Sequence, residues 1–139
     1  MSEATLSAQK FLRDLFIARA SLTALVPAES IRDTNQLPSV FPCIVIGEAQ
    51  FVADDATCLA AGECHMTCHV YTEEMGTENC KLIVGEIRRA VRDQSGTVDG
   101  FAIDAFFGDV LYLRDPDGKH AHGVVSIMCL AEDTLAGVV

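Results

Sequence analysis

Apolar residues recur at steps of three and four in two segments, which is the spacing of one face of an α-helix. The first segment covers residues 5–20, and Pro27 ends any continuation because a proline pushes the preceding residue out of the helical region. The second covers residues 77–93, where Thr77 is placed to cap the N-terminus. The pattern therefore predicts two amphipathic helices. Their apolar stripes are Ala8, Phe11, Leu12, Leu15, Ala18 and Leu22, and Cys80, Ile83, Val84, Ile87 and Val91.

Elsewhere apolar and polar residues alternate, as in half-buried β-strands. In residues 63–72 the apolar set is Cys64, Met66, Cys68 and Val70, and His65, Thr67, His69 and Tyr71 fall on the opposite face. The predicted strands are residues 43–51, 63–72, 101–114 with a bulge at Gly108, and 120–132, with residues 31–33 as a short edge strand.

The connections between these strands indicate how they pair. Residues 43–46 are apolar on both faces, which favours a central strand, and residues 52–62 are predicted to form a long, mobile hairpin loop. Asp115-Pro116-Asp117-Gly118 has the composition of a tight turn. We expect residues 1–139 to form a single α+β domain with a mostly antiparallel sheet of four to five strands and two helices packed on one face.

The composition narrows the possible functions. The chain has 139 residues and a formal net charge of −10, so its field would repel nucleic-acid phosphates. No apolar run approaches the length of a membrane span, and the start of the chain lacks the apolar core of a secretory signal. These features predict a cytoplasmic site of synthesis, where the six cysteines are expected to stay as free thiols.

Cysteine and histidine residues offer the main candidates for chemistry. Cys64 and Cys68 point opposite to His65 and His69 on the predicted strand, so the four side chains cannot converge on one zinc ion. A metal site that combines His69 with His120 or His122 stays open as an alternative, as does a reactive thiol at the loop residue Cys58. We favour a structural role for these residues, with buried, unreactive thiols and exposed histidines, and we expect no cofactor.

Charged clusters are the remaining candidates. Asp54-Asp55 and Glu73-Glu74 are adjacent acids in predicted loops, which are usually solvated, and Arg88, Arg89 and Arg92 end the second helix. The arginines complement the helix dipole and could also pair with the acids of a neighbour. The sequence contains no glycine-rich nucleotide motif, P-loop or nucleophile elbow, so we do not expect an enzyme.

In the order of several short segments, the sequence resembles the tail terminator family of phages and gene transfer agents, also called tail completion proteins. The segments are FPCIVIGEAQ, the loop ending AAGE, CHMTCHVYTEE, CKLIVGEIRRAV, LYLRDPDGKHAHGVV and a terminal AED. Together they cover nearly the whole chain. Two departures concern packing only: Tyr71 stands where the family usually has Trp, and cysteine is unusually frequent.

This resemblance implies a structural virion protein at the junction of tail and head, without catalytic activity. Such proteins form a ring, typically a hexamer, that caps the tail tube, stops its growth and offers a face to the head connector or stopper. DNA would pass through the ring without specific binding, and no membrane is involved. The expected interaction residues are Asp54, Asp55, Glu73, Glu74, Arg88, Arg89, Arg92, Arg114, Asp117 and His120. The alternatives are a small metal- or thiol-dependent enzyme, and another virion component such as a tube subunit or head–tail stopper.

Overall fold

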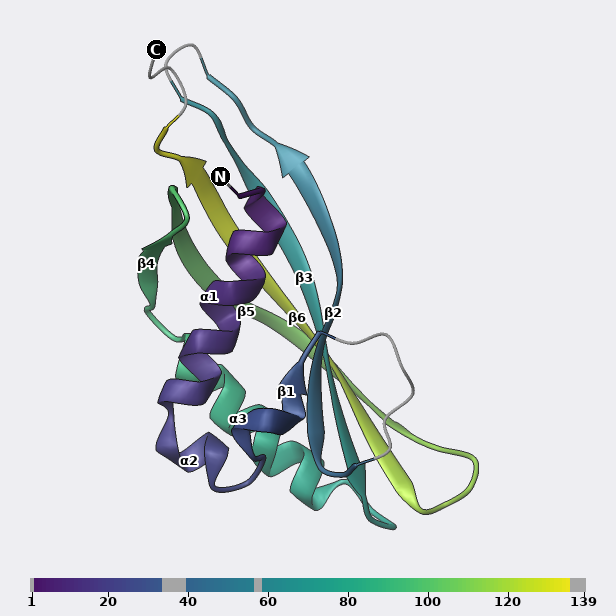
Figure 1. Ribbon diagram of the computed structural model, residues 1–139. Coiled ribbons are helices and arrows are strands. Elements are labelled where there is room, and N and C mark those ends of the chain that lie inside the picture. Colours follow the sequence, from purple (N-terminus) through teal and green to yellow (C-terminus); the bar gives the residue numbers. More distant parts are fainter. Residues whose placement is uncertain (1, 34–39, 57–58, 136–139) are drawn as a thin grey trace.

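A computed structural model describes residues 2–33, 40–56 and 59–135 and shows a six-stranded sheet with helices on one face (Figure 1). The strand order is β1-β2-β3-β6-β5-β4. All neighbouring strands are antiparallel except β1 and β2, which are parallel. The strands are β1 (Ile31–Arg32), β2 (Cys43–Ala53), β3 (Ala61–Glu73), β4 (Ser95–Val98), β5 (Phe101–Arg114) and β6 (His120–Asp133).

The predicted first helix is present but is interrupted at its C-terminal end. Helix α1 spans Ala4–Ala18, and Arg19 then takes an extended conformation before the short helix α2, Ala20–Thr23. The Glu3 side chain accepts hydrogen bonds from the first N–H groups of α1 and so caps it. A 3₁₀ turn, η1 (Ala28–Ser30), leads from α2 into β1.

The second predicted helix is α3 (Glu78–Val91), with Glu78 in its first turn and Arg88 and Arg89 in its last. The expected cap is wrong, because Thr77 makes no side-chain hydrogen bond to the helix. The carboxylate of Glu74 accepts instead from the N–H groups of Asn79 and Cys80, at 3.0 Å each. These bonds satisfy backbone donors that the helix itself leaves unpaired.

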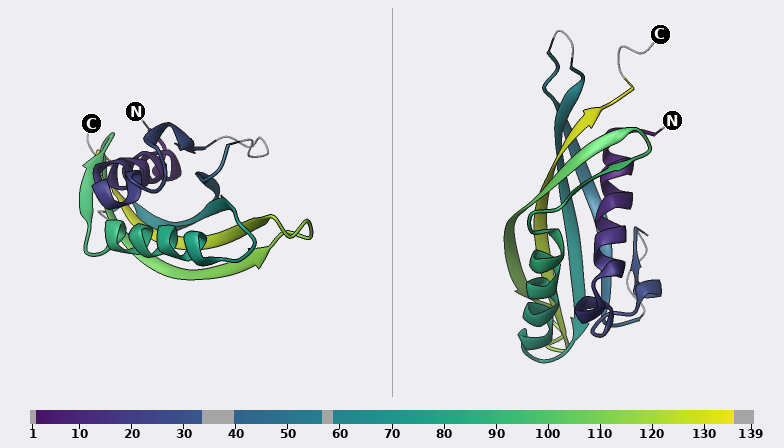
Figure 2. Two further views of the ribbon diagram at one scale, coloured as in Figure 1. Left: turned by 90° about the horizontal axis from the view of Figure 1, so that it is seen from below. Right: turned by 90° about the vertical axis from the view of Figure 1, so that its left-hand side faces the viewer.

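The core lies between the sheet and helices α1 and α3 (Figure 2). The predicted alternation in β3 is confirmed, because Cys64, Met66, Cys68 and Val70 are all buried against the helices. The matching positions of β6 face the same way. The helix stripes complete this core with Phe11, Leu12, Phe16, Leu22, Cys80, Ile83, Val84, Ile87 and Val91.

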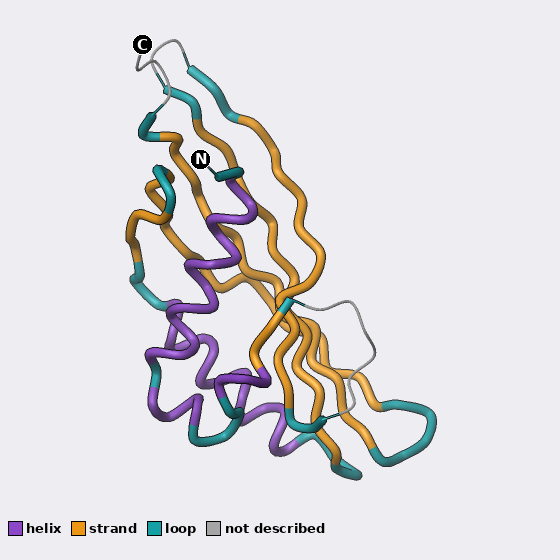
Figure 3. The backbone as a smooth tube through the Cα atoms, in the orientation of Figure 1, coloured by secondary structure: helices purple, strands orange, loops and turns teal. Residues whose placement is uncertain are grey.

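The long strands extend beyond the helical layer in both directions. The arm of β2 and β3 projects at one end, and the β5–β6 hairpin projects at the other (Figure 3). The bulge expected at Gly108 is confirmed by a register shift between Phe107 and Val110. The hairpin turn is also confirmed: Gly118 has a φ of +69°, and its N–H donates to the Asp115 carbonyl at 3.0 Å.

Three expectations about the fold need correction. The sheet has six strands rather than four or five, because Ser95–Val98 forms β4 where the sequence was interpreted as a helix end. The hairpin expected at residues 52–62 is shorter, since β2 continues to Ala53 and β3 begins at Ala61. The chain also forms a third, short helix, α2, in addition to the two that were predicted. Part of the predicted loop at residues 34–42 lies outside the described residues.

Candidate interaction surfaces

No described helix covers the second face of the sheet, which we call the open face. It carries the residues that alternate with the core set along β2, β3, β5 and β6. Exposed apolar side chains gather on its β5–β6 half, where Phe106, Leu111, Leu113 and Leu130 are between 40% and 59% exposed. An apolar area of this kind, continuous over two strands, is typical of a surface that meets another macromolecule.

Acidic residues are the only charged residues of the long strands on the open face. Within the described strands β2, β3, β5 and β6, Arg114 is the sole lysine or arginine, and the register places it on the helix-covered side, level with Ala121. The alternation and register place five acids on the open face: Glu48, Glu63, Glu73, Asp104 and Glu132. The open face therefore has a negative field that the long strands do not neutralise.

A chain of hydrogen-bonded side chains crosses the open face from β2 to β6. Glu48 accepts from His69 Nε2 at 2.9 Å, and His69 Nδ1 lies 2.8 Å from His122 Nε2. A carboxylate only accepts, so His69 donates to Glu48 from Nε2 and accepts the His122 proton on Nδ1. Tyr71 stacks on His122 with the ring centroids 4.3 Å apart.

This arrangement favours the neutral form of His122. Burial is the main cause that lowers its pKa, and the nearby His69 lowers it further, against the opposing carboxylates of Asp115 and Glu48. The sequence suggested a metal site that would combine His69 with His120 or His122. The structure brings His69 and His122 together but places His120 elsewhere.

The β5–β6 hairpin gathers three of the predicted interaction residues. His120 Nδ1 lies 2.6 Å from Asp117 Oδ2, and its Nε2 lies 3.7 Å from a Glu73 oxygen. The Lys119 N–H and the His120 ring lower the pKa of the Asp117 carboxyl. Asp115, Asp117 and His120 can place one ligand atom each within 4.8 Å of one another. Asp117 is exposed, whereas Asp115 and His120 are half-buried, and the Asp117 carboxylate already contacts the His120 ring.

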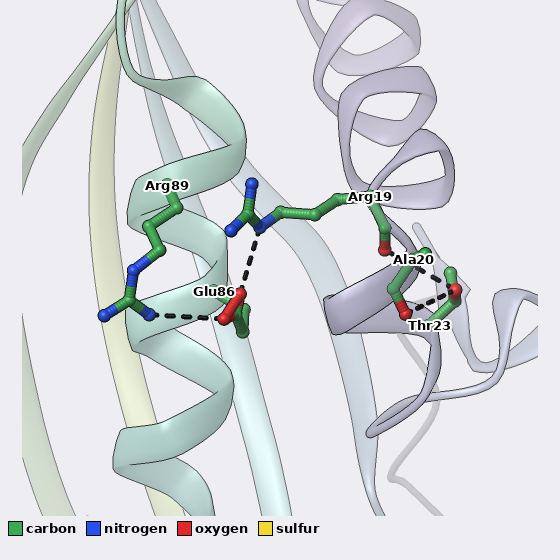
Figure 4. Close-up of polar contacts among 5 residues, drawn as sticks. All are labelled: Arg19, Ala20, Thr23, Glu86 and Arg89. Carbon is green, nitrogen blue, oxygen red and sulfur yellow. Dashed lines mark hydrogen bonds and ion pairs between the residues drawn. The ribbon is translucent and has the colours of Figure 1, made fainter.

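The predicted arginines divide into two groups on α3. Arg89 points toward Glu86, whose carboxylate accepts from Arg89 Nη1 at 3.2 Å and from Arg19 Nε at 3.0 Å (Figure 4). This side of α3 is therefore occupied by contacts within the chain. Arg88 lies over the Phe107 ring of β5. Arg92, which is 81% exposed, lines a shallow hollow together with Arg88 and Phe107.

The predicted acids also separate. Asp54 and Asp55 follow β2 at the tip of the arm, where Asp55 accepts the Ala61 N–H at 3.1 Å. Glu74, in contrast, is held by its capping role. Burial opposes ionisation, but hydrogen bonds from Thr72 and from backbone N–H groups lower the pKa of Glu74 overall. Glu74 thus has a local structural role, whereas the pair at the arm tip is exposed.

The described cysteines are buried free thiols. Burial raises the pKa of Cys64 and Cys80 to about 11 and that of Cys68 and Cys129 to about 12. Cys43 is also buried, with a raised pKa. Thiols in this state are poor nucleophiles. Cys58, the loop thiol considered above, lies outside the described residues.

Sequence reasoning missed the open-face residues, chiefly Glu48, Phe106, Leu111 and Leu113. The available signal was an apolar residue at nearly every position of β5, which showed that both of its faces carry apolar side chains. That signal does not tell which face the helices cover. The contact between Glu48 and His69 joins residues 21 positions apart, and nothing in the local pattern indicates it.

Comparison with known proteins adds two findings. Residues 10–132 match the sequence profile of the tail completion protein gp17 family. The fold is similar to a chain from the virion of a native gene transfer agent particle, with a TM-score of 0.83 and 14% sequence identity. The alignment covers 95% of this chain and 99% of that chain. A search of curated proteins gave no match. Among the described residues, no helix is both long and apolar enough to cross a membrane.

Proposed function

The chain belongs to the tail completion protein gp17 family, and on this premise we propose that it forms a closed ring on the tail tube of a phage or gene transfer agent. The ring would end tail polymerisation and join the tube to the head connector or stopper protein. This family is structural and not enzymatic. The protein would be made in the bacterial cytoplasm and then reside in the particle at the head–tail junction.

The observation that carries this proposal is the charge pattern of the open face. A surface that lines the path of a genome has to avoid binding phosphates, and the long strands offer the open face no cation. Its apolar residues and its five acids do not bind the phosphates of DNA. Six chains of −10 each would give a hexamer a formal charge of about −60. We therefore propose that the open face lines the hole.

The two ends of the long strands are suited to different partners. Asp54 and Asp55 lie at the tip of the arm, whereas Glu73, Asp117 and His120 lie around the hairpin at the opposite end (Figure 3). A ring of such subunits has two chemically distinct rims. One rim would meet the tail tube protein and the other the connector, which agrees with a protein that joins two different structures.

A deletion experiment tests the function directly. Particles produced without this gene should carry tails of uncontrolled length, or tails without heads, and the wild-type gene supplied in trans should restore uniform particles. Electron microscopy gives the distribution of tail lengths. Native mass spectrometry and negative-stain images of the purified protein test the ring. Tails of normal length joined to heads in the deletion strain would contradict the proposal.

The same images separate the other virion roles. A tube subunit would polymerise into open filaments, whereas the proposed function requires a closed ring that does not extend. A head–tail stopper would be found with the head in particles that lack tails, and a terminator with the finished tail. Labelling the protein in separated heads and tails therefore distinguishes the two.

A further inference from the structure

Two strands of the sheet have free edges over half of their length, and these halves lie at opposite ends and on opposite sides of the molecule. β1 pairs with β2 only at Ile44 and Val45, so no described strand pairs with the outer edge of β2 beyond them. β4 pairs with β5 only from Phe101 to Asp104. A free strand edge is a row of unpaired N–H and C=O groups that can add another strand.

Backbone hydrogen bonds at the strand ends show which residues face these edges. The Asp54 N–H donates to Ala61 of β3, so by alternation Ala49, Phe51 and Ala53 direct their N–H and C=O groups to the free side of β2. The Asp115 N–H donates to His120 of β6. By the same alternation, the groups of Val110, Tyr112 and Arg114 point to the free side of β5. Each edge thus offers three residues.

We propose that the free edge of β5 in one subunit pairs with the free edge of β2 in the next, so that a second copy of this chain is the partner at both edges. The inference rests on the proposed ring function and names the surface that closes the ring. β2 and β5 run antiparallel across the sheet, so the added pair continues the antiparallel order. The edge-facing residues of both strands also place their side chains on the helix-covered face, so the two faces of the sheet continue unbroken.

The charges at the two edges are complementary. The free half of β2 carries Glu48 and leads to Asp54 and Asp55. The free half of β5 carries Asp109 and ends at Arg114, and Lys81 of α3 lies over the Tyr112 ring. Arg88 and Arg92, at the end of α3, share a hollow with Phe107 and Asp93. Cations thus outnumber acids beside β5, whereas the free half of β2 carries only acids, and this difference favours the head-to-tail contact over a contact between two like edges. Head-to-tail contacts close into rings.

The offset between the edges also agrees with closure. Phe51 is level with Cys64 of β3, whereas Tyr112 is level, across β6, with Val70 of β3. Cys64 and Val70 are six residues apart, which is roughly 20 Å along the strand at about 3.3 Å per residue. The four long strands β2, β3, β6 and β5 are about 19 Å wide at ~4.8 Å per strand. A shift equal to the width requires strands tilted by about 45° to the ring axis, and closed sheets are typically tilted by about 35–45°.

The exposure of β2 supports an edge that is covered in the assembly. All six residues Glu48 to Ala53 are exposed, including Phe51 at 43% and Val52 at 44%. The described edge carries no proline or lysine, the residues that commonly protect a solvent-facing edge from pairing. A long, apolar, unprotected edge would be an aggregation site in a protein that worked as a monomer.

A pair of double variants tests the edge. Ala49→Pro with Ala53→Pro removes two N–H donors that face outward, without touching the bonds to β3, and both side chains are small and exposed. Ala49→Val with Ala53→Val is the matched control, because it keeps both donors. Native mass spectrometry should show rings for the wild type and the valine variant. The proline variant should stay monomeric, with the concentration for half-dissociation raised about 100-fold or more.

Hydrogen exchange in the wild-type protein gives a second readout that does not depend on a variant folding. Peptides covering residues 47–53 and 109–115 should exchange slowly in the ring and fast after dilution to monomers. Wild-type rings in which these peptides exchange as fast as in the monomer, or proline-variant rings of unchanged stability, would overturn the edge pairing and leave the ring function standing. A wild-type protein that forms no ring, alone or on tail tubes, would contradict the proposed function itself.

Discussion

His69 and His122 share a hydrogen bond of 2.8 Å across strands β3 and β6, with His69 held on its other side by Glu48. The sequence placed His69 on the polar face of a strand and raised His122 only as one alternative co-ligand in a metal site, whereas the structure joins the two residues, 53 positions apart, by a hydrogen bond. The contact makes the open face sensitive to protons. Neutral His122 donates a hydrogen bond to His69, and its pKa is lowered. When the His122 ring takes up a proton, it becomes positively charged beside His69.

We expect the stability of the folded chain to fall as the pH falls below the ordinary histidine pKa of 6.5. Because the pKa of His122 is lower in the folded state than in the unfolded chain, the unfolded state binds more protons in this range. His122→Gln should flatten the dependence of the unfolding free energy on pH between about 5 and 7. Urea denaturation measured at a series of pH values checks this. His65→Gln, which removes a histidine outside the His69–His122 contact, is the matched control.

Glu86 is the shared acceptor between α1 and α3, and its replacement should cost more than that of either arginine. Its carboxylate is only 16% exposed and accepts from both Arg19 and Arg89. Glu86→Ala should lower the unfolding free energy by about 1–2 kcal/mol because it leaves the Arg19 donor without its partner. Arg89→Ala should cost less than about 0.5 kcal/mol, since Arg89 is 62% exposed. Equal losses for the two variants, measured by urea denaturation, would show that Glu86 does not bridge the helices.

Gly62 lies in the arm so close to β2 that an added methyl group would collide with the backbone. A Cβ there would lie 2.7 Å from the Val52 carbonyl oxygen and against the Phe51 ring. Gly62→Ala should therefore destabilise the fold by about 1–3 kcal/mol and distort the edge of β2. Gly76→Ala is the control, because nothing lies within 4 Å of its Cβ and the expected change is within about 0.5 kcal/mol. Thermal melting of both variants tests this, and similar melting temperatures would count against the packing of the arm.

The fold was more accessible from sequence than the surfaces, and the reasons are physical. The stripe of α3 and the alternation of β3 follow from local periodicity, which the structure confirms. β4 was missed because Ser95 and Gly96 have low strand propensity, and it forms only because β5 lies beside it. Glu74 replaced Thr77 as the cap because the chain turns back before α3. Such contacts depend on long-range geometry that periodicity does not encode.

The thiols should resist alkylation until the chain unfolds. Cys43, Cys64, Cys68, Cys80 and Cys129 are buried, and their raised pKa values leave almost no thiolate at pH 8. Intact mass after treatment with iodoacetamide should show these five unmodified in the native protein and all of them modified in denaturant. Rapid native labelling at any of the five, located by peptide mapping, would mean that the sheet opens far more readily than its packing indicates.

The basic side of the proposed contact gives a last prediction, in which assembly depends on salt. Arg88→Glu with Arg92→Glu reverses the charges beside the free edge of β5, where they would face the acids of the next subunit's β2. We expect this variant to weaken the ring about 10-fold or more at low ionic strength, and the loss should shrink in high salt, where charges are screened. The control is Lys10→Glu with Arg32→Glu, which changes the net charge equally at two exposed positions outside the free halves of β2 and β5. Analytical ultracentrifugation at several salt concentrations measures both variants. An equal loss of assembly in the two would assign the effect to net charge and not to the β5 edge, whereas a loss confined to the Arg88 and Arg92 variant would place those arginines in the contact between subunits.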